Sequence, residues 1–222
     1  MTIFDDLHEK GRTAVLAGEH YTETPPVDGG PAWGLSVTLR PSAALAARLA
    51  EVTAEAAALT GQGHWPTGNA HSSHFTVRCM ERYRTGLPAE DPMVVRVGDA
   101  LRKAVVGLRP FRLEVTGLTL TPGSVMACAE ADGDTAELLK DRFTEALADD
   151  GHYEAGFRRN IWYANLVHFA APIAEPALLV DWVGDRRQLH LGEVLITEVE
   201  LLRWDYDGSQ MVPAVFEAVP LT

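Results

Sequence analysis

Apolar residues at every second position predict most of the strands of this chain. In residues 33–40 (WGLSVTLR) and 73–80 (SHFTVRCM), apolar and polar residues alternate, which is the period of a strand with one buried face. Residues 161–170 (IWYANLVHFA) are apolar at nearly every position, as expected of a strand that is covered on both faces. Further strands are predicted at residues 111–121, 124–129, 193–204 and 211–219, which are β-rich runs bounded by turn signals.

Apolar residues spaced three and four apart predict three helices. These helices run from Ser42 to Gly61, from Asp91 to about Gly107, and from Asp134 to about Ala148. Ser42 and Asp91 are preferred N-cap residues, and Pro92 suits the first turn. Glu137 follows Asp134 at the spacing of a capping box.

The order of strand, helix and histidine-bearing strand occurs twice in the chain. The two histidines are His74 and His168. This weak duplication predicts an α+β fold with two similar lobes, in which two antiparallel sheets face a central cleft and the helices lie outside. Residues 1–31 are predicted to be an N-terminal extension because prolines and glycines crowd its second half, and residues 32–222 are predicted to form one bilobal domain.

Composition narrows the classes of partner. The chain has 19 Lys and Arg against 31 Asp and Glu, and its formal charge of -12 argues against binding to duplex nucleic acid or to an anionic membrane. A small anionic ligand in a locally positive cleft is compatible with this charge. No apolar run approaches the ~18 residues that span a bilayer. Cys79 and Cys128 form no CxxC pair, and the acidic start lacks the features of a signal peptide, so a cytoplasmic location is expected.

The strand at residues 73–80 carries the first candidate chemistry. Side chains alternate across a strand, so His74, Thr76 and Arg78 are predicted to share one face, opposite Phe75 and the other apolar residues. An imidazole, a hydroxyl and a guanidinium on one face can hold a phosphate.

The same alternation places His168 in the strand at residues 161–170. If this strand is regular, His168 shares a face with Leu166 and Ala170, while Tyr163 and Asn165 lie on the opposite face.

The two histidine segments resemble a known pair of motifs. The tetrads His74-Phe75-Thr76-Val77 and His168-Phe169-Ala170-Ala171 are similar to the two HxTx motifs of the 2H phosphoesterase superfamily, the group of the bacterial 2′-5′ RNA ligases and RNA 2′,3′-cyclic phosphodiesterases. The order of elements after residue 32 is also similar. This resemblance implies a pseudo-twofold bilobal fold, no metal or other cofactor, and two histidines that face each other across a phosphodiester or cyclic phosphate.

The resemblance also implies roles for individual residues. His74 and His168 would act as acid and base, with Thr76 as the phosphate anchor. The expected substrate-binding residues are Arg78, Phe75, Tyr163, Arg158 and Ala170. The expected partner is a small nucleotide or an RNA end, bound by a monomer.

The second motif departs from the pattern because Ala170 stands where Thr or Ser is expected. A hydrogen bond to a charged group contributes roughly 1.5–3 kcal/mol, so its loss would cost about tenfold to a hundredfold in rate. Arg158, Arg159, Tyr163 or Asn165 could compensate, although the parity of the last two puts them on the wrong face of a regular strand. The alternatives are a phosphoesterase, a degenerate protein that binds a nucleotide or other anionic metabolite, and a fold adapted to another reaction.

Other histidines and aromatic residues have simpler interpretations. His64, His71 and His74 lack the spacing and the additional ligands of a zinc site. One aromatic residue is expected to stack on a nucleobase, from the set Trp33, Trp65, Tyr83, Trp162 and Tyr163. Trp204 is predicted to be structural.

Overall fold

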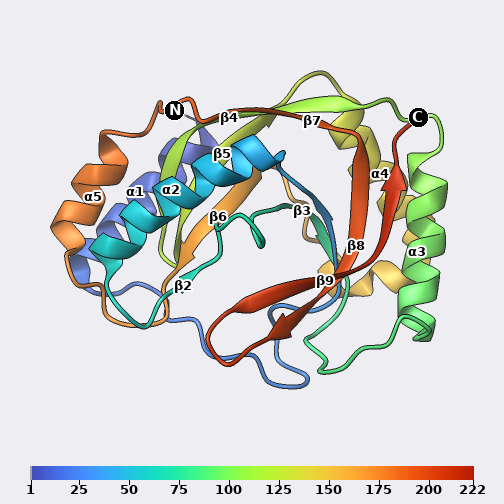
Figure 1. Cartoon of the computed structure of the whole chain (residues 1–222), viewed down its shortest axis with the longest axis horizontal. Helices are drawn as coiled ribbons and strands as arrows, with labels where there is room; N and C mark the ends of the chain where they lie inside the picture. The colour runs from blue at the N-terminus through green and yellow to red at the C-terminus, as the bar shows by residue number, and fades with distance from the viewer. Residues whose placement is uncertain (1) are drawn as a thin grey trace.

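Two antiparallel sheets and five α-helices make up the computed structural model, which describes residues 2–222 (Figure 1). The helices are α1 (Ile3–Ala17), α2 (Ala43–Thr60), α3 (Pro92–Val105), α4 (Thr135–Leu147) and α5 (Pro176–Gly184), with a 3₁₀ helix, η1, at Ala148–Glu154. The strands are β1 (Ser36–Leu39), β2 (Trp65–Pro66), β3 (Phe75–Cys79), β4 (Phe111–Thr121), β5 (Ser124–Ala131), β6 (Trp162–His168), β7 (Gly192–Ile196), β8 (Glu198–Tyr206) and β9 (Met211–Pro220).

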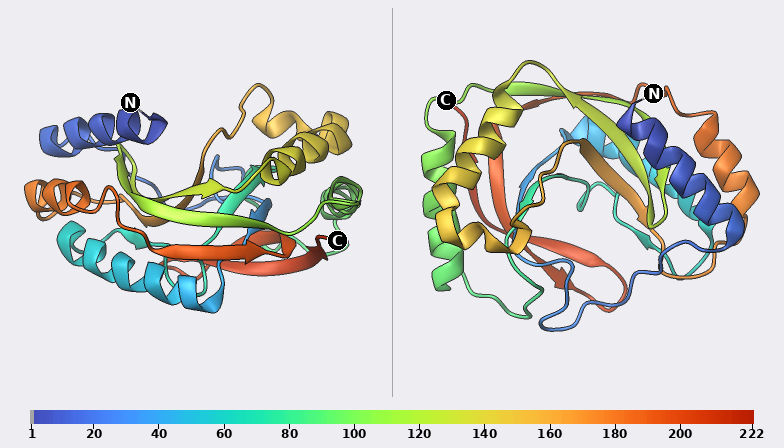
Figure 2. Two further views of the ribbon diagram at one scale, coloured as in Figure 1. Left: turned by 90° about the horizontal axis from the view of Figure 1, so that it is seen from above. Right: turned by 180° about the vertical axis from the view of Figure 1, so that it is seen from behind.

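Each sheet belongs to one lobe. The first sheet has the strand order β3-β1-β8-β9, and the second has the order β2-β6-β5-β4-β7. Helices α3 and α4 lie at one end of the molecule, and α1, α2 and α5 lie at the other (Figure 2). The predicted bilobal α+β architecture with helices outside the two sheets is therefore confirmed.

The two lobes share one hydrophobic core. Helix α2 directly follows β1 of the first sheet, yet it packs against β6 of the second sheet. Helix α4 joins β5 and β6 of the second sheet, yet it packs against α3. Buried residues of both sheets form one continuous apolar cluster that includes Phe75, Phe143 and Phe169. The lobes consequently hold each other in a fixed relative position.

The helices start largely as their caps predict. The Ser42 hydroxyl accepts a hydrogen bond from the Leu45 amide at 3.3 Å, and the Asp91 carboxylate accepts one from the Met93 amide at 2.8 Å. The predicted capping box at Asp134 is wrong. Asp134 has helical backbone angles, with φ at -102° and ψ at -5°, and its side chain caps no amide.

The stretch predicted as a strand at residues 193–204 is two strands. Strand β7 pairs with β4 in the second sheet, and β8 pairs with β1 and β9 in the first. Only Thr197 separates the two strands, so this residue is where the chain crosses between lobes. The alternation of apolar residues continues through such a crossing, so the sequence pattern does not reveal it.

The sequence-based prediction also lacked helices α1 and α5 and the short strand β2.

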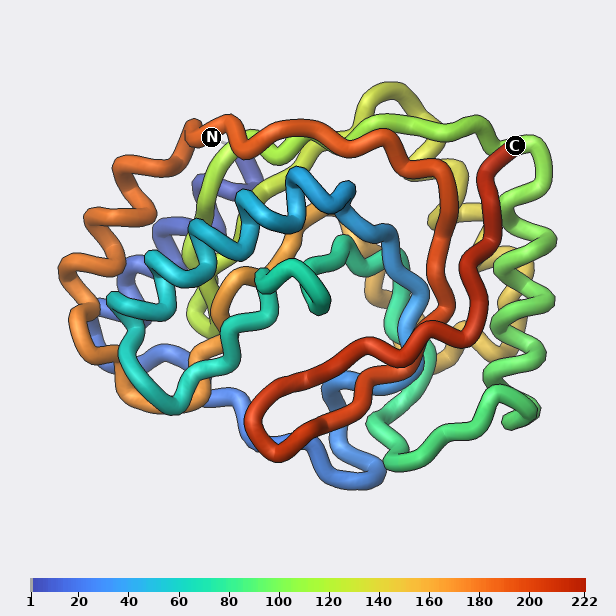
Figure 3. Tube along the Cα trace, in the orientation of Figure 1, coloured from blue at the N-terminus to red at the C-terminus, as the bar shows by residue number. Residues whose placement is uncertain are grey.

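The first residues of the chain are packed against the second lobe. Helix α1 lies on β4, and the Thr119 hydroxyl donates a hydrogen bond to the Phe4 carbonyl at 3.0 Å. The following segment (dark to medium blue in Figure 3) runs from the end of α1 toward β1. Its amides at Tyr21 and Glu23 donate to the carbonyls of Pro122 and Phe169, each at 2.7 Å.

None of the helices in residues 2–222 has the length and apolar character that crossing a membrane requires.

We predict that Gly11→Ala destabilises the protein although alanine favours helices. A Cβ at Gly11 would lie 2.6 Å from the carbonyl carbon of Leu120, so α1 must move away from β4. Overpacking of this kind costs about 1–3 kcal/mol, which exceeds the gain of roughly 1 kcal/mol in helix propensity. Urea unfolding measures the difference. Thr13→Ala, at an exposed position of the same helix, is the control, and a Gly11→Ala protein as stable as the wild type would contradict this packing.

Candidate active site

A cleft of about 260 Å³ lies where the two histidine strands approach each other. Strand β3 contributes Thr76 and Cys79, with His74 directly before it, and β6 contributes Tyr163, Asn165 and His168. The other lining residues come from three further places: Ser36 and Trp204 on the first sheet, Tyr153, Glu154 and Arg159 around η1, and Glu23, Pro31, Ala32 and Trp33 before β1. Both lobes and the N-terminal segment therefore build one site.

His74 is held in a defined orientation and tautomer. Its Nδ1 lies 2.7 Å from the Ser72 carbonyl oxygen, which can only accept, so Nδ1 carries the proton and Nε2 keeps a lone pair. The indole of Trp204 packs against the imidazole, with 4.6 Å between the ring centroids. Burial lowers the pKa of His74 to about 4, since the hydrogen bond to Ser72 only partly opposes it and Arg40 and Arg159 lower it further. The imidazole is accordingly neutral at pH 7.

His168 faces the same cleft with fewer polar contacts. Within residues 2–222, neither of its ring nitrogens has a hydrogen-bond partner, and the edge of Trp33 packs against the ring with 4.8 Å between centroids. Burial, and next to it the charge of a protonated His74, lowers the pKa of His168 to about 3. Both histidines are therefore neutral before any ligand is bound.

A bulge in β3 changes which side chains share a face with His74. Thr38 pairs with Thr76, and Val37 pairs with Arg78, so Val77 is an extra residue opposite β1. An extra residue shifts the alternation of the strand by one position. Cys79 consequently lines the cleft, and burial raises the pKa of its thiol.

The prediction that Arg78 shares the face of His74 and Thr76 is wrong because of this bulge. The Arg78 guanidinium donates to the Gly151 carbonyl at 2.7 Å and to the Thr144 hydroxyl at 3.1 Å, outside the histidine cleft.

Strand β6 contains a matching irregularity. Val125 pairs with Val167, and Met126 pairs with Asn165, so Leu166 is the extra residue. Asn165 and Tyr163 consequently lie in the cleft together with His168. The expectation that Tyr163 and Asn165 lie on the wrong face is wrong, because it assumed a regular strand.

Three other predicted binding residues lie elsewhere. Phe75 is fully buried in the core, so it is not available to a ligand in the cleft. Arg158 is exposed and forms an ion pair with Asp141 at 2.9 Å, on the far side of Arg159 from the cleft. Ala170 follows β6 and does not line the cleft.

The backbone around Ala170 is fastened by a structural histidine. The Ala170 amide donates to Nδ1 of His64 at 3.3 Å, and Nε2 of the same ring donates to the Pro172 carbonyl at 3.3 Å. Both nitrogens of His64 therefore form hydrogen bonds with the backbone.

In the described part of the chain, no three His, Cys, Asp or Glu side chains are grouped in a way that would suit a metal ion.

The charges in the cleft nearly cancel. Arg159 is the cation that lines it, and its Nη2 lies 2.5 Å from the Glu154 carboxylate in a largely buried ion pair. Arg159 also donates to the Tyr163 hydroxyl at 3.2 Å. Glu23 is a second carboxyl group in the lining, and burial raises its pKa.

Sequence reasoning assigned no role in the site to several of these residues. Trp204 was predicted to be structural, yet it packs against His74 and lines the cleft. Glu23 enters from the N-terminal segment, where no motif signals it. Of these three residues, only Trp33 had a signal in the sequence, as one of the aromatic residues considered for stacking on a base. Its backbone is in the left-handed conformation, with φ at 68°.

Comparisons with known proteins identify the fold. No family model matches the sequence, and no curated protein matches it significantly. The structure of TT0787 from Thermus thermophilus is similar with a TM-score of 0.61 and 21% identity, over 85% of this chain and 97% of that one. Escherichia coli LigT in complex with 3′-AMP is similar with a TM-score of 0.61 and 12% identity, over 86% of this chain and 98% of that one. A structure described as a phosphoesterase has a TM-score of 0.56 and 12% identity, over 86% and 99% of the two chains.

The chain therefore has the same fold as LigT. The resemblance drawn from the two histidine motifs is confirmed at the level of this fold.

We predict that the two histidines make folding stability fall as the pH is lowered below about 6.5. An unfolded imidazole has a pKa near ~6.5, whereas the folded values are about 4 and about 3. Between these limits the unfolded chain binds protons that the folded one does not, so stability is lost as the pH falls. From pH 7 to pH 5 this loss is at most about 2 kcal/mol for each histidine.

Urea unfolding at pH 7 and pH 5 measures this loss. The His74→Gln/His168→Gln double variant should lose clearly less stability between the two pH values than the wild type. His71→Gln, at an exposed position, is the control. Equal losses in wild type and double variant would show that the two imidazoles are not buried and neutral in solution.

Proposed function

We propose that this protein is a metal-independent phosphoesterase that acts on a small nucleotide substrate, a 2′,3′-cyclic phosphate or a 2′-5′ phosphodiester. The observation that carries the proposal is the pair of histidines, one from each lobe, in one small cleft of a LigT-like fold. The solved complex of LigT with 3′-AMP supports a nucleotide as the class of ligand. The cleft volume of about 260 Å³ lies below the range of about 300–1,000 Å³ for drug-sized ligands, which favours a single nucleotide or RNA end over a long RNA.

The proposed reaction is hydrolysis by two proton transfers. His74 accepts a proton from water at Nε2, the water oxygen forms a bond to phosphorus, and the bond from phosphorus to the ribose oxygen breaks. His168 donates a proton to that leaving oxygen. Each transfer typically contributes about 10²–10⁴ in rate.

His168 must be protonated for this role, and the bound phosphate supplies the reason. An anion close to an imidazole favours its charged form, so the substrate raises the pKa of His168 when it binds. His74 is the group that accepts a proton, because the Ser72 carbonyl holds the proton on Nδ1 and leaves the lone pair on Nε2.

Thr76 and Asn165 are the proposed phosphate anchors. The Thr76 hydroxyl lies two residues after His74, as in the HxT motif, and both side chains line the cleft. The Oδ1 atom of Asn165 is buried and has no hydrogen-bond partner within residues 2–222, while its Nδ2 is a donor suited to a phosphate oxygen. Asn165 therefore takes over the hydrogen bond that Ala170 cannot provide.

A second candidate function is binding without turnover. The Arg159 charge is neutralised by Glu154, and Glu23 adds another carboxyl group, so the cleft offers an anion no free positive charge. This arrangement favours a weakly charged ligand and is the specific observation behind a degenerate or repurposed site.

We predict that hydrolysis depends on both histidines. The purified protein, in EDTA, is incubated with 2′,3′-cyclic mononucleotides and 2′-5′ dinucleotides, and products are followed by phosphorus NMR. His74→Ala and His168→Ala should each reduce the rate by about 10²–10⁴. His190→Gln, on the surface, serves as the control. Binding of these nucleotides without any conversion by the wild type would favour the second candidate function.

We predict that Asn165→Ala lowers kcat/KM by about tenfold to a hundredfold, the effect of losing one hydrogen bond to a charged group. Asn165→Asp should be more harmful because it adds a negative charge beside the phosphate. Asn160→Ala, at an exposed position two residues before β6, is the matched control. A kcat/KM for Asn165→Ala equal to that of Asn160→Ala would remove Asn165 from the phosphate site.

A further inference from the structure

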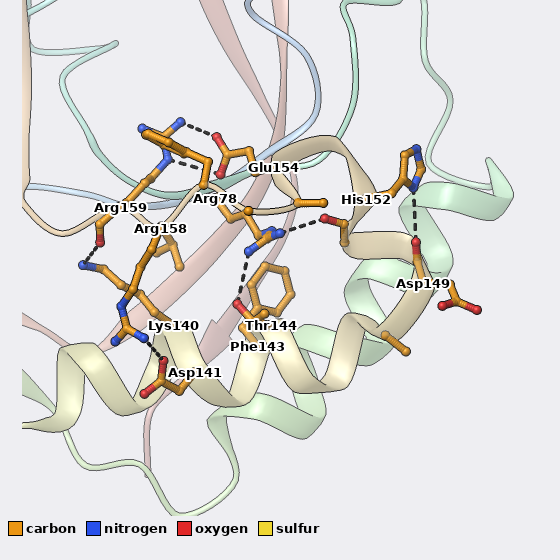
Figure 4. A pocket seen from close by; sticks show the side chains of 16 residues that line it. Arg78, Lys140, Asp141, Phe143, Thr144, Asp149, His152, Glu154, Arg158 and Arg159 are labelled. Carbon is orange, nitrogen blue, oxygen red and sulfur yellow. Dashed lines mark hydrogen bonds and ion pairs between the residues drawn. The ribbon is translucent and has the colours of Figure 1, made fainter.

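A cavity larger than the histidine cleft lies on the other side of the Arg159–Glu154 ion pair. Its volume is about 600 Å³, and it is enclosed by β3, α4, η1 and the loop at residues 155–159 (Figure 4). Val77 and Phe143 form its apolar floor and are buried. Arg159 and Glu154 line both this cavity and the cleft, so the two spaces share one wall.

Arg78 brings an uncompensated positive charge to this cavity. Its guanidinium is held by two neutral acceptors, the Gly151 carbonyl and the Thr144 hydroxyl. Within residues 2–222, no carboxylate lies within ion-pair distance of Arg78, and its buried Nε has no hydrogen-bond partner.

The other cations of the cavity are already paired. Lys140 lies 2.8 Å from Glu137, Arg158 lies 2.9 Å from Asp141, and Arg159 is paired with Glu154. The lining also contains the carboxylate of Asp149, so that, together with Glu137, four carboxylates stand near the four cations, and Arg78 is the cation among them without a carboxylate partner. Arg78 is thus the group in the lining that an added anion can neutralise, and the planar guanidinium suits phosphate oxygens.

An exposed aromatic ring completes the cavity. Phe157 is 57% exposed and lies on the rim, 5.5 Å from the Arg159 guanidinium carbon to the ring centroid. An exposed ring can stack on a nucleobase, and a guanidinium elsewhere in the same cavity can bind the phosphate of that nucleotide.

We propose that this cavity is a second binding site, which takes a nucleoside monophosphate with the phosphate on Arg78 and the base against Phe157. The site is separate from the histidine cleft and does not depend on the reaction proposed there. Its volume lies within the range of small-molecule sites.

Calorimetric titration of the full chain with inorganic phosphate and with adenosine 5′-monophosphate tests the site. Arg78→Met should weaken binding of both probes about tenfold or more. Phe157→Ala should weaken only adenosine 5′-monophosphate, by about tenfold, because only the base contacts the ring. Arg109→Met, which removes an exposed charge outside the cavity, should leave both affinities unchanged.

The controls separate this site from the cleft. If Arg78→Met unfolds at a lower temperature, Phe157→Ala still tests the site, because truncating an exposed ring leaves the core intact. Binding that persists in Thr76→Val/Asn165→Ala and is lost in Arg78→Met supports the second site, whether or not the protein hydrolyses any phosphodiester. Binding that follows Thr76 and Asn165 instead, or no binding of either probe at millimolar concentration, would overturn it.

Discussion

One extra residue in each of two strands decides which side chains meet in the cleft. In a regular strand, residues three apart point to opposite faces, and His168 and Asn165 are three apart. The bulge at Leu166 puts both into the cleft, and the bulge at Val77 does the same for Thr76 and Cys79. The same shift turns Arg78 away toward the second cavity. These two irregularities therefore decide which side chains of β3 and β6 line each of the two cavities.

The cleft keeps its geometry because the lobes share a core. Each lobe supplies one histidine, so the distance between the imidazoles is set by how the lobes pack. Helix α2 follows β1 of the first sheet and packs against β6 of the second, and the apolar cluster runs through both sheets. Trp33 and Trp204 pack against each other, with 5.9 Å between ring centroids, and each contacts one of the histidines. This aromatic contact joins the two halves of the site directly.

Electrostatics distinguish the two cavities on either side of Arg159 and Glu154. In the cleft the imidazoles are neutral because they are buried, and the Arg159 charge is matched by Glu154. In the proposed reaction, the bound phosphate gains a positively charged neighbour only when a histidine is protonated, so phosphate binding and proton uptake would be coupled. In the second cavity Arg78 already carries a permanent charge, so an anion can bind there without any proton transfer.

The sequence by itself determined the fold class, the helices α2, α3 and α4 and most of the strands. Helix caps at Ser42 and Asp91, alternation in β3 and the turn between β4 and β5 are local signals, and local signals predict local structure. The two histidine motifs, His74 to Val77 and His168 to Ala171, pointed to the fold that structural comparison confirms. Only the tertiary structure decided the membership of the site. A bulge depends on the partner strand, and Glu23, Trp33 and Trp204 reach the cleft from distant parts of the chain, so no spacing along the sequence encodes their meeting.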